Sequence, residues 1–550
     1  MPFLFMLQED FLRIIITLYA KHIKSPEYYL NYEKEEYQMK YKELAELYEK
    51  IESTHPRLEK TEILSNFLHK IKHLPETIYL LKGKIFADYD SRETGISEQL
   101  AIKSLAKASG IPEKELVKHW KKTGDLGKVA EEYTKHKRQS TLSTKELTIE
   151  KVLDNLKKLP ELQGKGTVAK KVDLVAELFT SSSPLEAKYI MRTLLADLRI
   201  GLGDGVLRDA IVWSSACLNK ENKEDFSLIQ ETYDLSTDWA LVFDRACHSK
   251  AMLENVELSP GKPVKVMLFP KVESVAEAFE VVGKPAAMEH KYDGFRMMIN
   301  KTEKGEIKIF TRRLDEVTNQ FPEVQDYAKK YVSAKSFILD GEAVGYNPKN
   351  HKYTSFQDIS QRIKRKYDIE KLQKELPIEL NIFDILYYNG KNLIKTPFIE
   401  RRKILEKIIN QKKWQMVLAK QIITDNEKKG EDFYKEALKE GQEGIMIKKL
   451  DAPYKPGARV GYGVKYKPAG NELDVVITGA EYGTGKRGGW LTSYDVSCRD
   501  ESGKLLEIGK VSTGLKEKNE EGFSFENMTE LIKPLITHSE GKHVKVKKTH

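Results

Sequence analysis

The stretch Glu289-His290-Lys291-Tyr292-Asp293-Gly294-Phe295-Arg296 decides how this chain is interpreted. It contains the pattern Lys-x-Asp-Gly, in which Lys291 ends a strand-like run and Asp293-Gly294 turns the chain directly behind it. A lysine held at such a turn is placed to act as a nucleophile. The pattern alone is weak evidence, because an ordinary surface hairpin can contain the same residues. The rest of the sequence must decide between the two interpretations.

The composition is that of a folded protein with several domains. The 550 residues exceed one ordinary domain, and a hydrophobic share of 40% is sufficient for packed cores, which excludes wholesale disorder. The net charge of +9 suits a polyanionic partner, but it suits an ordinary charged surface equally well. The three cysteines, Cys217, Cys247 and Cys498, form no Cys-x-x-Cys pair, so neither a zinc ribbon nor a disulfide framework is expected.

The sequence also predicts a cytoplasmic protein. The most apolar stretch, residues 3–20, is interrupted by Gln8, Glu9, Asp10 and Arg13, whereas a membrane helix needs about 18 uninterrupted apolar residues. The same stretch lacks the basic start and the small-residue cleavage site of a signal peptide. We therefore expect no membrane segment.

Residues 39 to about 255 carry a helical pattern. Leu44, Leu47 and Ile51 recur at spacings of three and four, which places them on one face of a helix. Ser183-Pro184-Leu185-Glu186 has the order of a helix start, with serine as the N-cap and glutamate three residues later.

Basic residues gather in this helical region. The loop Gly164-Lys165-Gly166-Thr167, followed by Lys170 and Lys171, opens a helix whose backbone N–H groups and basic side chains could hold a backbone phosphate. The alternative is a solvated helical face without special function.

From residue 256 the pattern becomes that of a mixed α+β domain. Short runs rich in β-branched and aromatic residues, bounded by Gly, Asn and Pro, predict strands. These runs cover residues 286–290, 297–300, 307–311, 337–345, 380–388, 445–449 and 463–467. Asn389-Gly390 predicts a tight turn, and residues 400–409 predict an intervening helix.

From residue 470 the chain returns to short strands separated by Gly-rich turns. The expected strands cover residues 474–479, 491–498 and 505–511. A small β-barrel with one helix over residues 528–536 is the expected fold.

The Lys-x-Asp-Gly pattern opens an ordered series of motifs. The later members are Phe310-Thr311-Arg312-Arg313, Leu339-Asp340-Gly341-Glu342-Ala343-Val344, Asn381-Ile382-Phe383-Asp384-Ile385-Leu386, Glu443-Gly444-Ile445-Met446-Ile447-Lys448, Pro456-Gly457-Ala458-Arg459 and Val464-Lys465-Tyr466-Lys467. In this order and at these intervals they resemble the six-motif core of the covalent nucleotidyltransferases. The series therefore favours a catalytic lysine over a surface hairpin.

Segments outside that core narrow the resemblance. They are Gly124-Asp125-Leu126-Gly127, Glu186-Ala187-Lys188-Tyr189, Leu198-Arg199-Ile200-Gly201 and Gly479-Ala480-Glu481-Tyr482-Gly483-Thr484-Gly485-Lys486-Arg487. With the core motifs they resemble the ATP-dependent DNA ligases of archaeal and eukaryotic type over about residues 39–548. NAD-dependent ligases share Lys-x-Asp-Gly but also carry a cysteine zinc site, which this sequence lacks.

The resemblance implies a multidomain fold. An all-α DNA-binding domain is expected at residues 39–255, an α+β nucleotidyltransferase (adenylation) domain at 256–469 and an OB-fold β-barrel at 470–550. Residues 1–38 precede the resemblance and are expected to be an extension of unknown role. The barrel is expected to be truncated, because no arginine-rich motif of Arg-Phe-Pro-Arg type, which the family carries near its end, occurs before His550.

The resemblance also implies a reaction in three steps. An enzyme lysine attacks ATP and expels pyrophosphate, AMP passes to the 5′-phosphate at a nick, and the 3′-hydroxyl then displaces AMP. All three steps are phosphoryl transfers, so positioning and charge neutralisation should carry most of the catalysis. ATP, Mg²⁺ and nicked double-stranded DNA are the expected co-substrate, metal and partner.

Site residues follow from the resemblance, position by position. Lys291 is the expected nucleophile. The expected ATP-binding residues are Glu289, Arg296, Arg312, Glu342, Phe383, Arg459, Lys465 and Lys467, and the expected Mg²⁺ ligands are Glu342 and Glu443. The pattern itself adds that Lys465 and Lys467 face the same side of a strand. Periodicity alone makes Phe383 a core residue, whereas the resemblance makes it the stacking platform for adenine.

The expected DNA contacts lie in the helical domain, at Lys165, Thr167, Lys170 and Arg199. Binding should be independent of base sequence and sensitive to salt, because the contacts are to backbone phosphates. A sliding clamp is a candidate further partner, and the protein is expected to be a monomer associated with the nucleoid.

Two alternatives stay open at this point. An RNA ligase or a capping-type nucleotidyltransferase shares the core motifs but lacks the helical domain, and labelling by ATP rather than GTP would separate them. A nick-binding protein with crippled adenylation would bind DNA without sealing it. The intact Lys291, Glu342 and Glu443 argue against such a decayed core.

Overall fold

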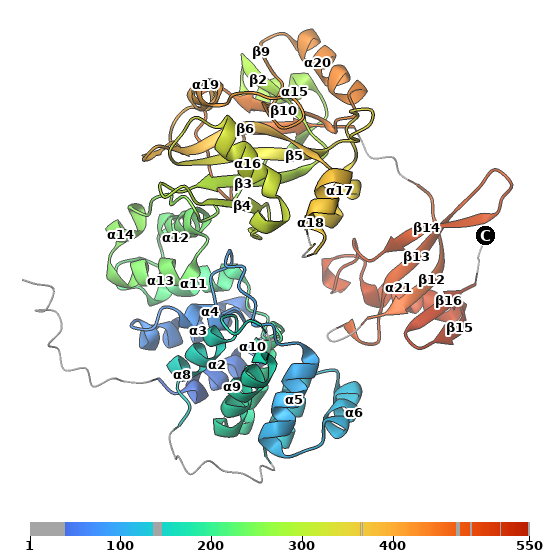
Figure 1. Cartoon of the computed structure of the whole chain (residues 1–550). Helices are drawn as coiled ribbons and strands as arrows, with labels where there is room; N and C mark the ends of the chain where they lie inside the picture. Colours follow the sequence, from blue (N-terminus) through green and yellow to red (C-terminus); the bar gives the residue numbers. More distant parts are fainter. Residues whose placement is uncertain are drawn as a thin grey trace, which may run out of the picture.

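The structure is a computed structural model, and it describes residues 39–135, 146–164, 166–363, 365, 367–468, 473–483, 487–517 and 519–547 (Figure 1). A helical region, a mixed α/β region and a C-terminal antiparallel sheet follow one another along the chain. Residues 1–38, Lys165 and the expected join at 469–470 lie outside the described residues. None of the described helices is long and apolar enough to cross a membrane.

The helical region extends from Tyr41 to Glu254. Its α-helices are α2 (Tyr41–Ser53), α3 (Arg57–Leu68), α4 (Thr77–Leu81), α5 (Glu98–Ser109), α6 (Glu113–Thr123), α7 (Leu126–Thr134), α8 (Ile149–Lys158), α9 (Thr167–Ser181), α10 (Pro184–Leu194), α11 (Asp204–Ser214), α12 (Lys223–Ser236), α13 (Trp239–His248) and α14 (Lys250–Glu254). The predicted start of α10 is confirmed, because the Ser183 hydroxyl accepts the Glu186 N–H and the Glu186 carboxylate accepts the Ser183 N–H.

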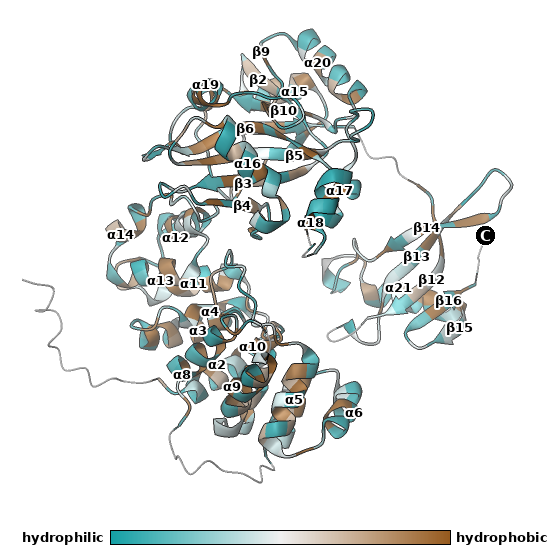
Figure 2. Cartoon of the chain, in the orientation of Figure 1, coloured by the Kyte–Doolittle hydropathy of each residue, from teal (hydrophilic) through white to brown (hydrophobic). Residues whose placement is uncertain are grey.

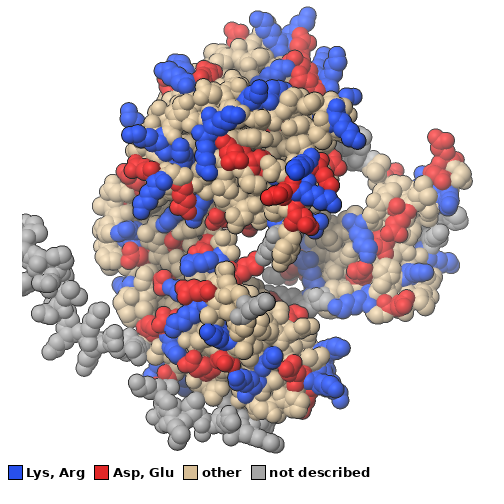
Figure 3. All heavy atoms as spheres, in the orientation of Figure 1, with Lys and Arg blue, Asp and Glu red and all other residues tan. Residues whose placement is uncertain are grey.

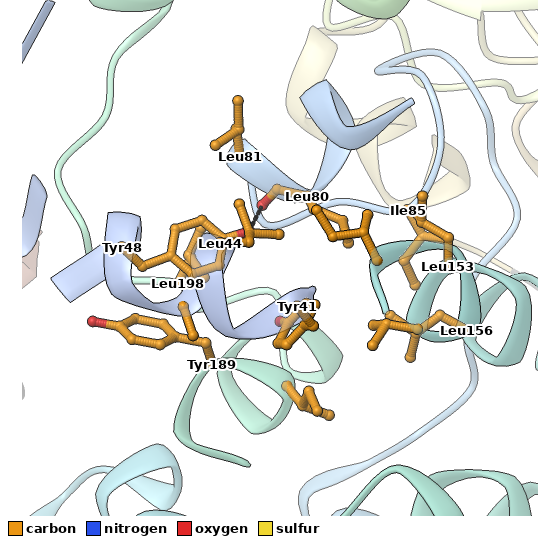
Figure 4. Close-up of a cluster of buried hydrophobic side chains, with 14 of the residues drawn as sticks. Tyr41, Leu44, Tyr48, Leu80, Leu81, Ile85, Leu153, Leu156, Tyr189 and Leu198 are labelled. Atoms are coloured by element: carbon orange, nitrogen blue, oxygen red, sulfur yellow. Dashed lines mark hydrogen bonds between the residues drawn. The ribbon is translucent and has the colours of Figure 1, made fainter. Parts of the chain in front are cut away.

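The apolar face predicted for α2 lines the core of the helical region. Leu44, Leu47 and Ile51 are all buried, and Figure 4 shows Leu44 among side chains contributed by α4, α8 and α10. The Tyr48 hydroxyl donates a hydrogen bond to the Leu80 carbonyl at 2.8 Å, so this buried phenol keeps a polar partner. Figure 2 shows polar residues on the outer sides of the same helices. Burial of one face of each helix thus stabilises the region.

Asp88, in the segment that follows α4, ties that segment to α12. Its carboxylate accepts hydrogen bonds from Lys82 Nζ at 2.7 Å, Lys84 Nζ at 2.7 Å and the Tyr233 hydroxyl at 2.5 Å. Burial alone would raise the pKa of Asp88, but Lys82, with Lys84 and Tyr233, lowers it to about 2. The ionised carboxylate therefore stabilises the fold above about pH 4, and this stabilisation is lost as the pH falls towards about 2.

We expect Asp88→Asn to lower the free energy of unfolding by about 2 kcal/mol at neutral pH. The variant should also lose less stability than the wild type between about pH 4 and pH 2. Urea unfolding followed by far-ultraviolet circular dichroism at several pH values measures both effects. Asp173→Asn is the matched control, because Asp173 pairs with Lys107 on an exposed surface and such pairs contribute little. Equal acid sensitivity of Asp88→Asn and wild type would contradict the assignment.

The central region is built on two sheets. One sheet has the strand order β1 (Lys271–Val272), β11 (Gly463–Tyr466), β10 (Gly444–Lys449), β2 (Ala286–Lys291) and β9 (Gln421–Thr424). The other has the order β4 (Ile307–Thr311), β3 (Phe295–Lys301), β5 (Phe337–Gly345), β6 (Ile378–Tyr388) and β7 (Lys391–Asn392), with β8 (Met416–Leu418) also paired to β6. The accompanying helices are α15 (Val275–Val282), α16 (Pro322–Tyr331), α17 (Phe356–Ile363), α18 (Ile369–Glu375), α19 (Phe398–Ile408) and α20 (Glu427–Lys439).

The strands predicted for the central region are confirmed to within two residues at either end. The predicted helix over 400–409 is α19. Asn389 and Gly390 have φ values of 44° and 87° between β6 and β7, which is the backbone of a tight hairpin turn. Alternating and β-branched patterns therefore located these elements correctly.

The C-terminal region is an antiparallel sheet with one face covered by a helix. Its strand order is β14 (Leu505–Val511), β13 (Leu491–Arg499), β12 (Val476–Tyr482), β16 (His543–Val546) and β15 (Ile536–Glu540). Within the described residues β14 and β15 are the two edges and do not pair, so the sheet stays open. Figure 1 shows this sheet to one side of the other two regions.

The helix predicted over residues 528–536 was wrong in its bounds. Helix α21 covers Phe525–Ile532, because Ser524 caps its start, and Ile536 already begins β15. The strands β15 and β16 were missed, since their polar, charged sequences lack the apolar alternation of a half-buried strand.

Candidate active site

Three neighbouring strands bring the predicted reactive residues together. β2 ends at Lys291, which pairs with Gly444 at the start of β10, and the next strand, β11, carries Lys465. Lys291 Nζ lies 2.5 Å from Glu443 Oε2, and Lys467 Nζ lies 3.9 Å from the same oxygen. Lys291, the predicted nucleophile, and Lys467, a predicted phosphate contact, therefore both lie near the Glu443 carboxylate.

Two glycines allow the backbone to close tightly around Lys291. A Cβ atom on Gly294 would lie 2.3 Å from the Ala343 carbonyl oxygen. A Cβ atom on Gly444 would lie 2.2 Å from the Tyr466 carbonyl oxygen, and Gly444 has a φ of +144°. No side chain fits at either position, so the two motif glycines are required for these close approaches.

Lys465 lies in a cluster of positive charges. Burial lowers the pKa of Lys465 below its usual value, and the charges on Lys467, Arg459, Lys291 and Arg312 lower it further. Arg312 and Arg459 are themselves exposed. Cations from four sequence motifs thus converge on one place, which favours the binding of a polyanion there.

Glu342 lies beside the same cluster in a more buried position. Burial raises the pKa of Glu342 to about 8, although the charges of Arg296 and Lys291 oppose the rise. The nearby carboxylates of Asp340 and Glu443 add to it. The two predicted metal ligands are therefore close enough to repel one another when both are ionised.

A network of hydrogen bonds holds the Arg296 guanidinium. Its Nε donates to Asp340 Oδ1 at 2.8 Å, its Nη2 donates to Asp340 Oδ2, and its Nη1 donates to the Met267 carbonyl at 3.3 Å. The Tyr454 hydroxyl donates to Asp340 Oδ2 at 3.0 Å. Asp340 and Tyr454 were missed by the sequence analysis. Asp340 lies two residues before Glu342 in the motif Leu339–Val344, so its position in that motif could have indicated a role. Tyr454 lies in no motif.

Glu289 is the centre of a second buried polar cluster. Lys448 Nζ lies 2.6 Å from Glu289 Oε2. Gln421 Nε2 donates to Glu289 Oε1 at 2.8 Å, and Arg402 Nη1 lies 3.6 Å from that oxygen. The sequence analysis missed these three partners. Lys448 closes a quoted motif, whereas Gln421 and Arg402 carry no sequence signal.

Phe383 connects the two clusters. Lys448 Nζ lies 4.8 Å from the centre of its ring, and the Arg296 guanidinium lies 5.2 Å from it. The ring is half-buried and packs with Tyr292, Val344 and Ala419. A planar group could therefore stack on it within reach of Glu289.

Two family models match this chain. A family model described as the DNA ligase N terminus matches residues 40–212, and one described as the ATP dependent DNA ligase domain matches residues 266–467. A DNA ligase of Nanoarchaeum equitans is 43% identical over 515 residues, which span 92% of this chain and 89% of that protein. The chain belongs to the ATP-dependent DNA ligases. A DNA ligase of Thermococcus fumicolans is 38% identical over the same shares of the two chains.

One solved structure matches about half of this chain. It is described as mycobacterial DNA ligase D complexed with ATP and MES. The match covers 52% of this chain and 86% of that one, at 25% identity and a TM-score of 0.32.

This ligase joins 3′-hydroxyl and 5′-phosphate ends at nicks in duplex DNA, through a lysyl-AMP and a DNA-adenylate. It uses ATP as co-substrate, with Mg²⁺ as the usual metal. The family match extends over the helical region, so an RNA ligase or a capping-type enzyme is not favoured.

The ligase site fits a divalent cation. Burial raises the pKa of Glu342, and the Asp340 and Glu443 carboxylates raise it further, so a cation near Glu342 and Glu443 would relieve this repulsion. In the part of the chain that the structure describes, no group of three or more His, Cys, Asp or Glu side chains could hold a metal by itself. We expect phosphate and water oxygens to complete the coordination shell, as they commonly do for Mg²⁺.

The predicted DNA contacts lie in the helical region of the ligase, and the described ones occupy two places. Thr167 begins α9, where its hydroxyl donates to the Gly164 carbonyl at 2.7 Å, and Lys170 is exposed on the same helix. Arg199 lies elsewhere, beside the Gly124 carbonyl, with its Nε 2.6 Å from Asp197 Oδ2. Lys165 is outside the described residues. Figure 3 shows basic and acidic side chains interspersed over all three regions of the face drawn.

Proposed function

We propose that Lys291 is the residue that accepts AMP, and that the surrounding cluster performs the first step of ligation. The observation that carries this proposal is the meeting of Lys291, Glu443 and Lys467 at one end of adjacent strands. The carboxylate holds the lysine amine in place, and the neighbouring cations would bind the triphosphate. Such preorganised charge is the main means by which proteins accelerate phosphoryl transfer.

Charge neutralisation is the proposed role of the basic residues. Lys465 and Lys467 would bind the α-phosphate, and the exposed Arg312 and Arg459 would bind the remaining phosphates or the ribose. Arg296 would contribute from within its Asp340 network, where its position is fixed.

Glu342 and Glu443 would hold Mg²⁺, which when bound supplies neutralisation of charge on the phosphate oxygens. In the protein alone Glu443 pairs with Lys291, so its carboxylate faces the place where the phosphates would lie. Glu342 would also contact the ribose. Lys291 must lose a proton before it can attack, because only the neutral amine has a free electron pair.

Adenine recognition is the proposed role of Glu289 and Phe383. The base would stack on the Phe383 ring, and the Glu289 carboxylate would accept a hydrogen bond from its amino group. The two residues are joined in space by Lys448, which contacts both.

Each of the three regions has its own proposed role in ligation. We assign DNA binding to residues 39–255, with Lys165, Thr167, Lys170 and Arg199 as phosphate contacts, adenylation to residues 256–469, and an OB-fold role to residues 470–550. The exposed side chain of Lys170 and the helix start at Thr167 support phosphate contacts at that end of α9. We also propose that the ligase acts as a monomer on the nucleoid, with a sliding clamp as a further partner.

A pulse–chase experiment tests the order of these steps. The ligase is treated with α-labelled ATP and Mg²⁺, freed of nucleotide and then mixed with nicked duplex DNA. We expect the label to appear first on protein, then on the 5′ end at the nick, and finally as free AMP while the strand is sealed. Intact duplex is the control and should leave the label on protein. Label that stays on protein despite DNA binding would support a nick-binding protein instead.

A further inference from the structure

Gln421 occupies an unusual place in the Glu289 cluster. It opens β9, pairs in register with Glu289 on β2, and directs its Nε2 to Glu289 Oε1 at 2.8 Å. Glu289 is only 2% exposed, whereas Gln421 is half-buried and can be reached from outside the sheet. The neutral amide of Gln421 thus lies between the buried Glu289 carboxylate and the solvent-accessible surface.

Compensation of the buried charge does not require this amide. Lys448 Nζ already lies 2.6 Å from Glu289 Oε2, and Arg402 Nη1 lies 3.6 Å from Oε1. Two cations can therefore balance the carboxylate. What Gln421 adds is a directed bond that fixes the plane of the carboxylate, together with a carbonyl oxygen that can accept a hydrogen bond.

We propose that Gln421 is a specificity-determining residue that makes the site select adenine over guanine. This inference rests on the proposed roles of Glu289 and Phe383 in binding the base. The exocyclic amino group of adenine has two N–H donors. One would bond to Glu289 and the other to the Gln421 carbonyl oxygen.

Guanine carries a carbonyl oxygen at the position of the adenine amino group. While Gln421 Nε2 stays bonded to Glu289, its carbonyl oxygen and the Glu289 carboxylate would both face this third acceptor, with no proton between them. A polar site of this kind rejects the wrong base because its own buried groups are left without partners. Glu289 alone would discriminate less well, since without Gln421 its carboxylate could turn towards Lys448 and Arg402.

The test compares covalent labelling of Lys291 by α-labelled ATP and by α-labelled GTP over a range of concentrations. Gln421→Met keeps the length of the side chain and removes both polar atoms, and Gln421→Ala is the second variant. We expect the KM for ATP to rise about tenfold with kcat within about twofold, while the KM for GTP stays the same or falls. The preference for ATP over GTP should therefore fall about tenfold or more.

Ile423→Ala is the matched control. Ile423 lies two residues further along β9 and is 47% exposed, so its loss should change neither KM nor the nucleotide preference. Thermal unfolding of each variant reports whether β9 has been disturbed.

Two results would overturn the inference. An unchanged ratio of ATP to GTP labelling in both Gln421 variants would make the residue a structural support only, as would an equal loss for both nucleotides. If the wild type were labelled at a residue other than Lys291, or not at all, the proposed function itself would fail, and the inference with it.

Discussion

Lys291→Ala is expected to reduce covalent labelling of the ligase by α-labelled ATP to background. The amine of Lys291 is the nucleophile in the proposed first step, and alanine offers no atom that could form the bond to phosphorus. The neighbouring Lys465 is held on a different strand by the pairing of β11 with β10, and Lys467 directly follows that strand, so neither replaces the Lys291 amine. Labelling with Mg²⁺, read after denaturation, measures the effect.

Two controls make the Lys291 result specific. Lys449→Ala removes a lysine at the far end of β10, where it lies near Asp451, and should leave labelling within about twofold of wild type. Lys291→Ala should still seal a nick that already carries AMP, because the last step needs no lysyl adenylate. Labelling that persists in Lys291→Ala would contradict the assignment of Lys291 as the nucleophile. Loss of both activities would indicate instead that the ion pair with Glu443 holds the site together.

The sequence was sufficient for the parts of the fold that repeat a local pattern. Leu44, Leu47 and Ile51 lie on one helical face because 3.6-residue periodicity is a local property of the chain. Seven central strands were found for the same reason, since their β-branched runs are bounded by turn residues, whereas the short strands β1, β7, β8 and β9 were missed. Helix α21 was misplaced although its signals are local, because the cap between Ser524 and Asn527 was overlooked and the polar hairpin of β15 and β16 lacks apolar alternation.

In the candidate site, residues in sequence motifs could be predicted, whereas residues placed by strand pairing could not. Lys291, Glu443, Lys465 and Lys467 could be named in advance because each stands in a motif, and the structure places Lys291 and Lys467 at the Glu443 carboxylate. Gln421 could not be named. Its relation to Glu289 arises from the register of β9 against β2, which no pattern within residues 421–424 reveals. Side chains that act through a neighbour become visible only when the pairing of strands is known.

Glu443→Gln is expected to slow self-adenylation by about 10²- to 10³-fold. The substitution keeps the shape of the side chain and the Glu443 backbone N–H bond to the Lys291 carbonyl, which measures 2.8 Å. It removes the negative charge that pairs with Lys291 and, in the proposed mechanism, one of two carboxylates that hold Mg²⁺. Because Glu443 is partly exposed, its neutralisation should change the melting temperature little.

The matched control for Glu443 is Glu440→Gln. Glu440 lies three residues earlier, is exposed to a similar degree, and pairs with Lys420 rather than with Lys291. It should retain self-adenylation within about twofold, since an exposed ion pair contributes little to either stability or catalysis.

A titration with Mg²⁺ separates the two roles of Glu443. If the carboxylate helps to hold the metal, Glu443→Gln needs more Mg²⁺ to reach its reduced maximum. If it only positions the lysine, the Mg²⁺ dependence is unchanged and the rate alone falls. Retention of near wild-type labelling would remove Glu443 from the catalytic machinery, and Glu342 would then be the remaining candidate for the metal.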